Sequence, residues 1–131
     1  MKTITQWKKN REFESRLGTN TIQLDGAKQV GFGPKALLLS GLAGCSGIDL
    51  VDILEKMKIE FSDLTIDVEA EQTEDYPKVY KDIYITYKLR ASRENEEKIK
   101  KAINLSLDKY CGVAAMLKKN SPIHSKLEIL E

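Results

Sequence analysis

The chain has 131 residues, of which 41% are hydrophobic and 31% are charged, and its formal net charge is +1. This length and composition are ordinary for a globular protein with a core of its own, so we expect a single domain over residues 1–131. Lysines and acidic residues alternate along most of the chain, which argues against a basic surface and therefore against nucleic acid as a partner.

No segment resembles a targeting or membrane signal. The N-terminal stretch reads MKTITQWKKNREF and lacks the apolar core of a signal peptide. The longest uncharged run, 36–48, is shorter than the roughly 18 apolar residues that cross a bilayer, so it is interpreted as a buried core helix. We therefore expect a cytoplasmic protein without a membrane partner, whose two cysteines are kept reduced.

The first part of the chain predicts three short antiparallel strands, over 2–8, 11–17 and 20–24. Turn residues separate them, at Lys9-Asn10 and again at Gly18 to Asn20. The following stretch, GAKQVGFGP, is rich in glycine and indicates a loop. Pro34 then lies where a helix would begin.

Residues 35–58 have the periodicity of a long helix. Apolar residues recur at steps of three and four, namely Leu38, Leu42, Cys45 and Ile48. Glycines recur every third residue at 41, 44 and 47, and each weakens a helix by about 1 kcal/mol relative to alanine. We expect close approach of another backbone there, at a helix crossing or a subunit interface. Further along, the acidic stripe Asp49, Asp52 and Glu55 is typical of a solvated face.

The second half predicts a hairpin, helices and a last strand. Two alternating runs, 62–72 and 78–91, are joined through TEDYP and indicate a β-hairpin. Ser92 is a candidate N-cap for the helix after it, and 108–120 form a second helix or continue the first after a break. Pro122 ends this region before a strand over 125–131. The order βββ–α–ββ–α(α)–β predicts an α+β fold.

Each cysteine is interpreted either as a buried structural residue or as a reactive thiol. Buried structural cysteines are common, and both Cys45 and Cys111 lie in the most apolar parts of the chain. An apolar setting and Asp49, four residues on, would raise the pKa of a Cys45 thiol, whereas a helix N-terminus at Cys111 would favour a thiolate. His124 is the only histidine and is interpreted as a surface residue, because it cannot build a metal site with two scattered cysteines.

Two motifs carry a resemblance to a known family. The segment GPKALLLSGLAGCSGIDLVDILEKM resembles the central helix of the OsmC/Ohr family, and LDKYCGVAAML resembles that family's second cysteine motif. The order of strands and helices agrees over essentially the whole chain. The resemblance implies the OsmC-like fold and an intertwined homodimer, in which a long central helix packs against its partner and the glycines allow close packing.

The resemblance also implies a chemistry, that of an organic hydroperoxide reductase active in the oxidative stress response. Carried onto this chain, Cys45 is the peroxidatic thiol and Cys111 the resolving thiol. A dithiol reductant restores both, and no metal or other cofactor is implied. The family's arginine stabilises the thiolate and a glutamate orients it. Here Lys35 occupies the glutamate position, and Arg11, Arg16 and Lys35 are the candidate cations.

Two functions remain open on the sequence. A redox enzyme predicts a cation near the Cys45 sulfur and two sulfurs within bonding reach. A non-catalytic module that binds a small molecule or a partner protein predicts two protonated, unreactive thiols on the same scaffold.

Overall fold

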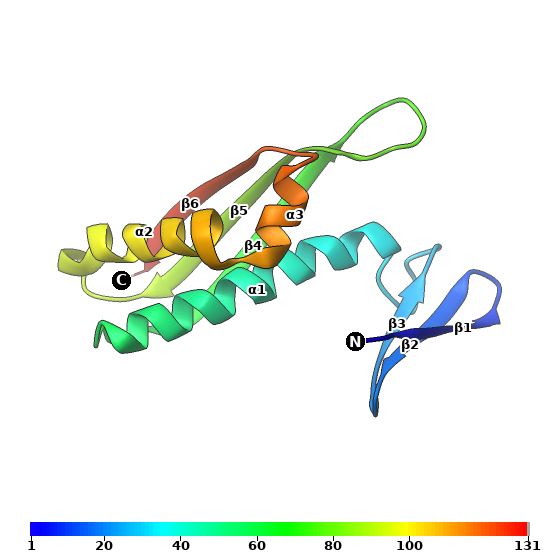
Figure 1. Ribbon diagram of the computed structural model, residues 1–131, viewed down its shortest axis with the longest axis horizontal. Helices are drawn as coiled ribbons and strands as arrows, with labels where there is room; N and C mark the ends of the chain where they lie inside the picture. The colour runs from blue at the N-terminus through cyan, green and yellow to red at the C-terminus, as the bar shows by residue number, and fades with distance from the viewer. Residues whose placement is uncertain (131) are drawn as a thin grey trace. The chain divides into compact units, whose positions relative to one another are not determined.

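The computed structural model describes residues 1–130 of the chain and divides it into two compact units, Met1–Leu38 and Leu39–Glu131. The first unit holds a three-stranded sheet, and the second holds another three-stranded sheet with helices. Strands and helices follow one another in the predicted α+β order (Figure 1).

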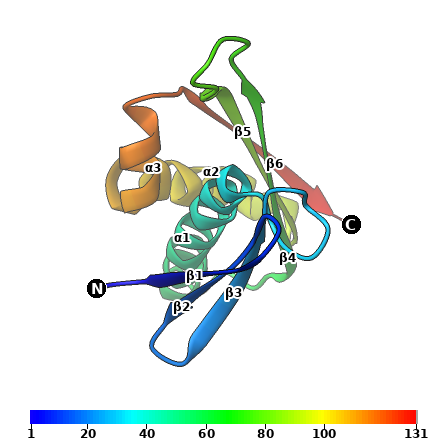
Figure 2. The ribbon, with the colours of Figure 1, turned by 90° about the vertical axis from the view of Figure 1, so that its right-hand side faces the viewer.

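The first unit is an antiparallel meander of β1 (Ile4–Lys9), β2 (Glu12–Leu17) and β3 (Asn20–Asp25). The strands lie in the order β1-β2-β3, and Figure 2 shows this sheet. The two predicted turns are confirmed, and each contains a residue with positive φ, Asn10 at 50° and Gly18 at 61°. Asparagine and glycine are the residues that adopt this left-handed region most readily, which explains their place in the turns.

Asp25 organises the loop that follows β3. Its buried carboxylate accepts hydrogen bonds from the backbone N–H groups of Ala27 (2.8 Å), Gln29 (3.0 Å) and Val30 (3.1 Å). These bonds, that of Ala27 first, hold the pKa of Asp25 below its ordinary value, and the charge of Arg11 lowers the pKa further. The glycine-rich segment is therefore an ordered loop.

The sheet of the second unit consists of β4 (Ser62–Gln72), β5 (Tyr80–Arg90) and β6 (Ile123–Leu130), with β5 in the centre. The predicted β4–β5 hairpin is confirmed as an antiparallel pair. The last strand, β6, pairs parallel to β5, an arrangement that the alternating pattern alone could not predict.

Helix α1 (Pro34–Lys56) begins at the predicted proline. Within the second unit its buried residues are Leu42, Ser46, Leu50 and Leu54, spaced four apart along one face. By length and composition this whole helix is long and apolar enough to cross a bilayer, although the run 36–48 within it is too short. Its buried stripe belongs to the core of the second unit, as the prediction of a core helix requires.

The helical region between β5 and β6 differs in detail from the prediction. Ser92 precedes a short 3₁₀ turn, Arg93–Asn95, and its side chain caps nothing, so α2 begins only at Glu96 and runs to Leu105. A π-helical turn, Ser106–Tyr110, then separates α2 from α3 (Gly112–Lys118). The predicted break is confirmed, but the second helix starts after Cys111 and not at Asp108.

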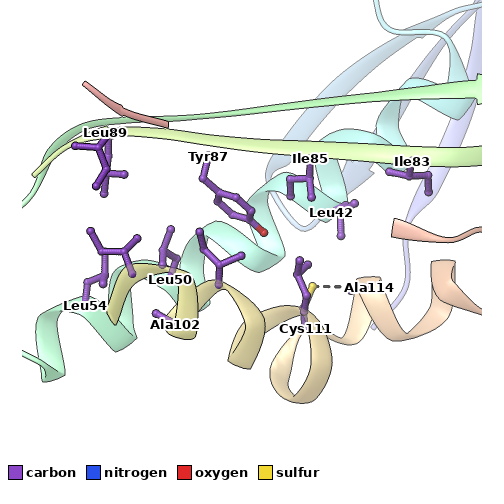
Figure 3. Close-up of a cluster of buried hydrophobic side chains, with 14 of the residues drawn as sticks. Leu42, Leu50, Leu54, Ile83, Ile85, Tyr87, Leu89, Ala102, Cys111 and Ala114 are labelled. Atoms are coloured by element: carbon purple, nitrogen blue, oxygen red, sulfur yellow. Dashed lines mark hydrogen bonds between the residues drawn. The ribbon is translucent and has the colours of Figure 1, made fainter. Parts of the chain in front are cut away.

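The core of the second unit lies between one face of its sheet and the helices. Alternate residues of β5 are buried and point toward α1 and α2 (Figure 3), namely Ile83, Ile85, Tyr87 and Leu89. They meet the buried face of α1 and the apolar stripe of α2, with members Ile99, Ala102 and Ile103.

The helix glycines do not approach another backbone within the described residues. A Cβ added at Gly41 or Gly44 would meet nothing within 4 Å, and one at Gly47 would meet the side-chain Cδ1 of Ile66 at 2.9 Å. The predicted helix crossing is therefore wrong for these glycines, because what packs near Gly47 is a side chain of β4. The second expectation, a subunit interface, is untouched by this finding.

Candidate functional site

Both cysteines lie in the second unit, Cys45 on α1 and Cys111 at the start of α3. Cys45 is in the middle of α1 and is half-buried, and Cys111 is buried with 3% of its surface exposed. Both are free thiols, and the Cys45 side chain is close enough to that of Cys111 to affect its pKa. Residues 66 positions apart in the sequence thus meet at one point of the core, as the sequence left open.

The π-helical turn sets the position of Cys111. The N–H of Cys111 donates to the carbonyl of Ser106 over 2.7 Å, a bond across five residues that closes the turn. Cys111 then leaves the helical conformation, with φ −76° and ψ 105°, and becomes the N-cap of α3. Its sulfur accepts a hydrogen bond from the N–H of Ala114 at 3.3 Å (Figure 3). The predicted position at a helix N-terminus is confirmed.

Burial outweighs that N-terminal position in its effect on the Cys111 thiol. The pKa of Cys111 is raised from 9.0 to about 11, mainly by burial, and the neighbouring Cys45 thiol adds to the rise. The Ala114 N–H acts in the opposite direction, and the charge of Asp49 adds to the rise. The expected stabilisation of a Cys111 thiolate is therefore wrong, because desolvation of the charged form is the larger effect.

A chain of buried hydroxyl groups lies beside the thiols. The Ser46 Oγ is 2.6 Å from the Tyr87 hydroxyl and 2.8 Å from the Ser106 Oγ. The Ser106 hydroxyl also donates to the Asp49 carboxylate over 3.0 Å. Tyr87, Ser46 and Ser106 are fully buried, and each has at least one hydrogen-bond partner. This hydroxyl chain of Tyr87, Ser46 and Ser106 therefore links β5, α1 and the π-helical turn.

The surroundings of Tyr87 hold its hydroxyl group neutral. Burial raises the pKa of Tyr87 to about 12, the hydrogen bond with Ser46 opposes this, and the nearby Cys111 and Asp49 add to it. In Figure 3 the Tyr87 ring extends from β5 with its hydroxyl toward the part of the core that holds Cys111. Tyr87 is thus a neutral hydroxyl group next to a neutral thiol at physiological pH.

These hydroxyl residues were not predicted from the sequence, and one acidic residue was predicted in the wrong environment. Ser46 lies on the buried face of α1, four residues from both Leu42 and Leu50. A serine at this apolar spacing was the feature of the sequence that could have indicated a buried hydroxyl group. Asp49 was expected on a solvated face. Its side chain is instead half-buried and accepts a hydrogen bond from the buried Ser106. The rest of the acidic stripe, Asp52 and Glu55, is exposed as predicted.

The three candidate cations lie in the first unit. Arg11 lies in the β1–β2 turn, and its guanidinium is so close to Gly26 that a Cβ there would lie 2.7 Å from Nε. Arg16 is an exposed residue of β2, and Lys35 is exposed in the first turn of α1. Their action on the Cys45 thiol stays a prediction.

His124 is an exposed residue of β6, as predicted. Its ring stacks on that of Tyr84 with centroids 5.0 Å apart, and its Nε2 is 2.9 Å from an Asp82 oxygen. Within residues 1–130 no three His, Cys, Asp or Glu side chains gather as possible metal ligands.

Comparison with known proteins identifies the family. Residues 25–126 match the family described as OsmC-like protein. The chain belongs to the OsmC family. Protein YhfA of Escherichia coli K12 is 30% identical to it over 97 residues, which are 74% of this chain and 72% of YhfA.

Solved structures of other proteins share the fold. A hypothetical protein from Aquifex aeolicus VF5 superposes with a TM-score of 0.88 at 27% identity, covering 98% of this chain and 95% of the other. The organic hydroperoxide resistance protein OhrB of Bacillus subtilis superposes with a TM-score of 0.67 at 21% identity, covering 97% and 96%. The likeness to OhrB establishes a common OsmC-like fold and no more.

Proposed function

We propose that this OsmC family member is a thiol-dependent redox protein that reduces organic hydroperoxides through Cys45 and Cys111. The observation that carries the proposal is the pair of neighbouring free thiols, one half-buried and one buried. The Bacillus subtilis neighbour is named an organic hydroperoxide resistance protein, and the proposal extends that class of substrate to this chain. A cytoplasmic location, where thiols are kept reduced, belongs to the same proposal.

The proposed reaction has three balanced steps. The Cys45 sulfur attacks the O–O bond of the hydroperoxide, takes the terminal oxygen as a sulfenic acid and releases the alcohol. The Cys111 sulfur then attacks the Cys45 sulfur, the S–O bond breaks, and the leaving hydroxide takes the Cys111 proton to become water. A dithiol reductant transfers two electrons and two protons to the disulfide and restores both thiols.

The environments of the two sulfurs fit this division of roles. A peroxide must reach the first sulfur, and Cys45 is the more exposed of the two. The raised pKa of Cys111 keeps it as a thiol, so it carries the proton that the leaving hydroxide needs. Reaction at Cys45 itself requires a thiolate, and we assign its stabilisation to one of Arg11, Arg16 and Lys35.

We also propose that the protein is a homodimer through the open face of α1. That face presents Gly41 and Gly44, beside which a Cβ would find open space, and Ile48, whose surface is 66% exposed. An apolar cleft continues it, lined by Gly44, Gly47, Ile48, Val51, Asp52 and Leu64. Glycines at a solvated helix face only weaken the helix, whereas at an interface they allow a partner helix to approach closely.

The test is consumption of cumene hydroperoxide by the reduced, purified protein in the presence of a dithiol reductant. We expect turnover that Cys45→Ser abolishes, and with the reductant left out Cys111→Ser should consume about one equivalent of peroxide and stop at the sulfenic acid. Arg11→Gln, Arg16→Gln and Lys35→Gln, measured separately, should show one variant with a strongly reduced kcat/KM. Turnover in the wild type no faster than in Cys45→Ser would reject the enzyme and leave the non-catalytic binding module.

A further inference from the structure

We propose that the hydroxyl chain Tyr87–Ser46–Ser106–Asp49 positions the two thiols for disulfide formation. The inference deepens the proposed function, on which it rests, by assigning positioning residues to its second step. Ser46 is the next residue after Cys45, and Ser106 provides the carbonyl that receives the N–H of Cys111. The 2.8 Å bond between the two serine hydroxyls therefore joins the backbones that carry the two sulfurs.

Because each hydroxyl group has one proton, the hydrogen bonds of the hydroxyl chain can be donated in only one direction. The Ser106 hydroxyl donates to the Asp49 carboxyl group, and this commits its one proton. Ser46 must then donate to Ser106, and Tyr87 must donate to Ser46. No hydroxyl can rotate without breaking a bond, because each has only one proton to give. The serine–serine contact is therefore fixed in geometry as well as in distance.

Burial makes this contact difficult to replace. Ser46 and Ser106 are fully buried, so no bulk water substitutes for a lost partner. The Asp49 end of the hydroxyl chain is less enclosed. Asp49 lines a cleft of about 490 Å³ together with the exposed side chains of Leu105 and Tyr110. Solvent can reach the charged end while the part next to the cysteines stays dry, so the buried links hold α1 against the π-helical turn.

Disulfide formation depends on this alignment. A disulfide requires the two sulfurs at about 2.05 Å and the two Cα atoms within roughly 4.4–6.8 Å. A displacement of about 1 Å between reacting groups can reduce a rate by two orders of magnitude. The two cysteines are held by separate elements, α1 and the π-helical turn, so a link between these elements controls the effective concentration of one thiol at the other.

The experiment measures that effective concentration without any peroxide. The protein is equilibrated with reduced and oxidised glutathione, in the exchange of one protein disulfide and two glutathione thiols for two protein thiols and glutathione disulfide. The fraction of the Cys45–Cys111 disulfide is read by mass spectrometry. Ser106→Ala removes the central link, and Tyr87→Phe removes only the terminal hydroxyl and keeps the ring. Ser121→Ala is the matched control, because Ser121 is also buried and donates to the Tyr80 carbonyl at 2.8 Å.

We expect Ser106→Ala to lower the effective concentration about tenfold or more, and Tyr87→Phe to lower it less, with Ser121→Ala unchanged. Urea unfolding of each variant shows whether it folds, and Tyr87→Phe alone carries the test if Ser106→Ala does not fold. The same effective concentration in wild type, Ser106→Ala and Tyr87→Phe would overturn the positioning role. The proposed peroxidase activity can fail without the positioning role failing. If the protein forms the disulfide but consumes no hydroperoxide, the enzymatic function is rejected and the positioning role stands.

Discussion

The protonation of Cys111 provides a direct test of which physical effect controls the thiol site. In the Cys45→Ser variant Cys111 is the only thiol, and serine keeps a hydroxyl at the position of its partner. Burial, the largest effect, is unchanged by this substitution, so we expect the pKa of Cys111 to stay near its value of about 11. An ordinary thiol at 9.0 is two pH units lower, so at pH 8 Cys111 should hold roughly a hundredfold less thiolate.

The assay is the rate of alkylation by iodoacetamide between pH 7 and pH 11.5, followed by mass spectrometry. Restricted access to a buried sulfur slows the reaction at every pH, so the midpoint of the profile, and not the rate itself, reports the pKa. The same variant unfolded in urea provides the ordinary midpoint, and circular dichroism checks that the native fold persists at high pH.

A native midpoint at or below that of the unfolded variant would refute this reasoning. It would mean that the Ala114 N–H and the start of α3 stabilise the thiolate by more than burial destabilises it. The resolving thiol would then be charged before Cys45 is oxidised, and the leaving hydroxide would need a proton from another group.

Three further predictions concern stability and association. Leu50→Ala removes a fully buried side chain of the core, so urea unfolding should show a free energy of unfolding lower by about 2–5 kcal/mol; a loss under 1 kcal/mol would contradict the packing. Gly44→Ala should strengthen the isolated helix but weaken the proposed dimer, so sedimentation should show easier dissociation, and association as tight as in the wild type would argue against this interface. Asp25, with its lowered pKa, stabilises the fold above pH 3.8, and that contribution disappears as the pH falls through its folded pKa; Asp25→Asn should therefore be less stable at pH 7, by a margin that shrinks in acid and that a flat difference would disprove.

Much of the fold follows from local pattern. Strict alternation in β4 and β5, the turn residues Asn10 and Gly18, and the helical period of α1 predict elements close to those observed. Local pattern could not show that β6 runs parallel to β5, because the same alternation fits either direction. Local pattern also could not predict the π-helical turn. The one extra residue of such a turn does not visibly change the spacing of apolar residues in so short a segment.

The sequence indicated two candidate cysteines but not the electrostatics around them. The two cysteine motifs pointed to a pair, and the structure places the two thiols near one another, while their catalytic roles stay a prediction. The pKa of Cys111 depends on how deeply α3 and β5 enclose it, which is a property of tertiary packing. The hydroxyl chain was equally hidden, because Ser46, Tyr87 and Ser106 come from three separate elements and only the fold brings them together.

The parallel pairing of β6 also has a consequence for how the protein folds. Strand β5 carries four fully buried residues, yet its second neighbour is separated from it by more than thirty residues of helix and turn. Until the segment Ile123–Leu130 is added, one side of this apolar strand offers unpaired backbone groups to any other extended chain. Closing so long a connection is slow compared with forming the β4–β5 hairpin, so docking of β6 should be a late event in folding. During that interval the molecule is most exposed to aggregation, and the central strand is where intermolecular pairing would begin.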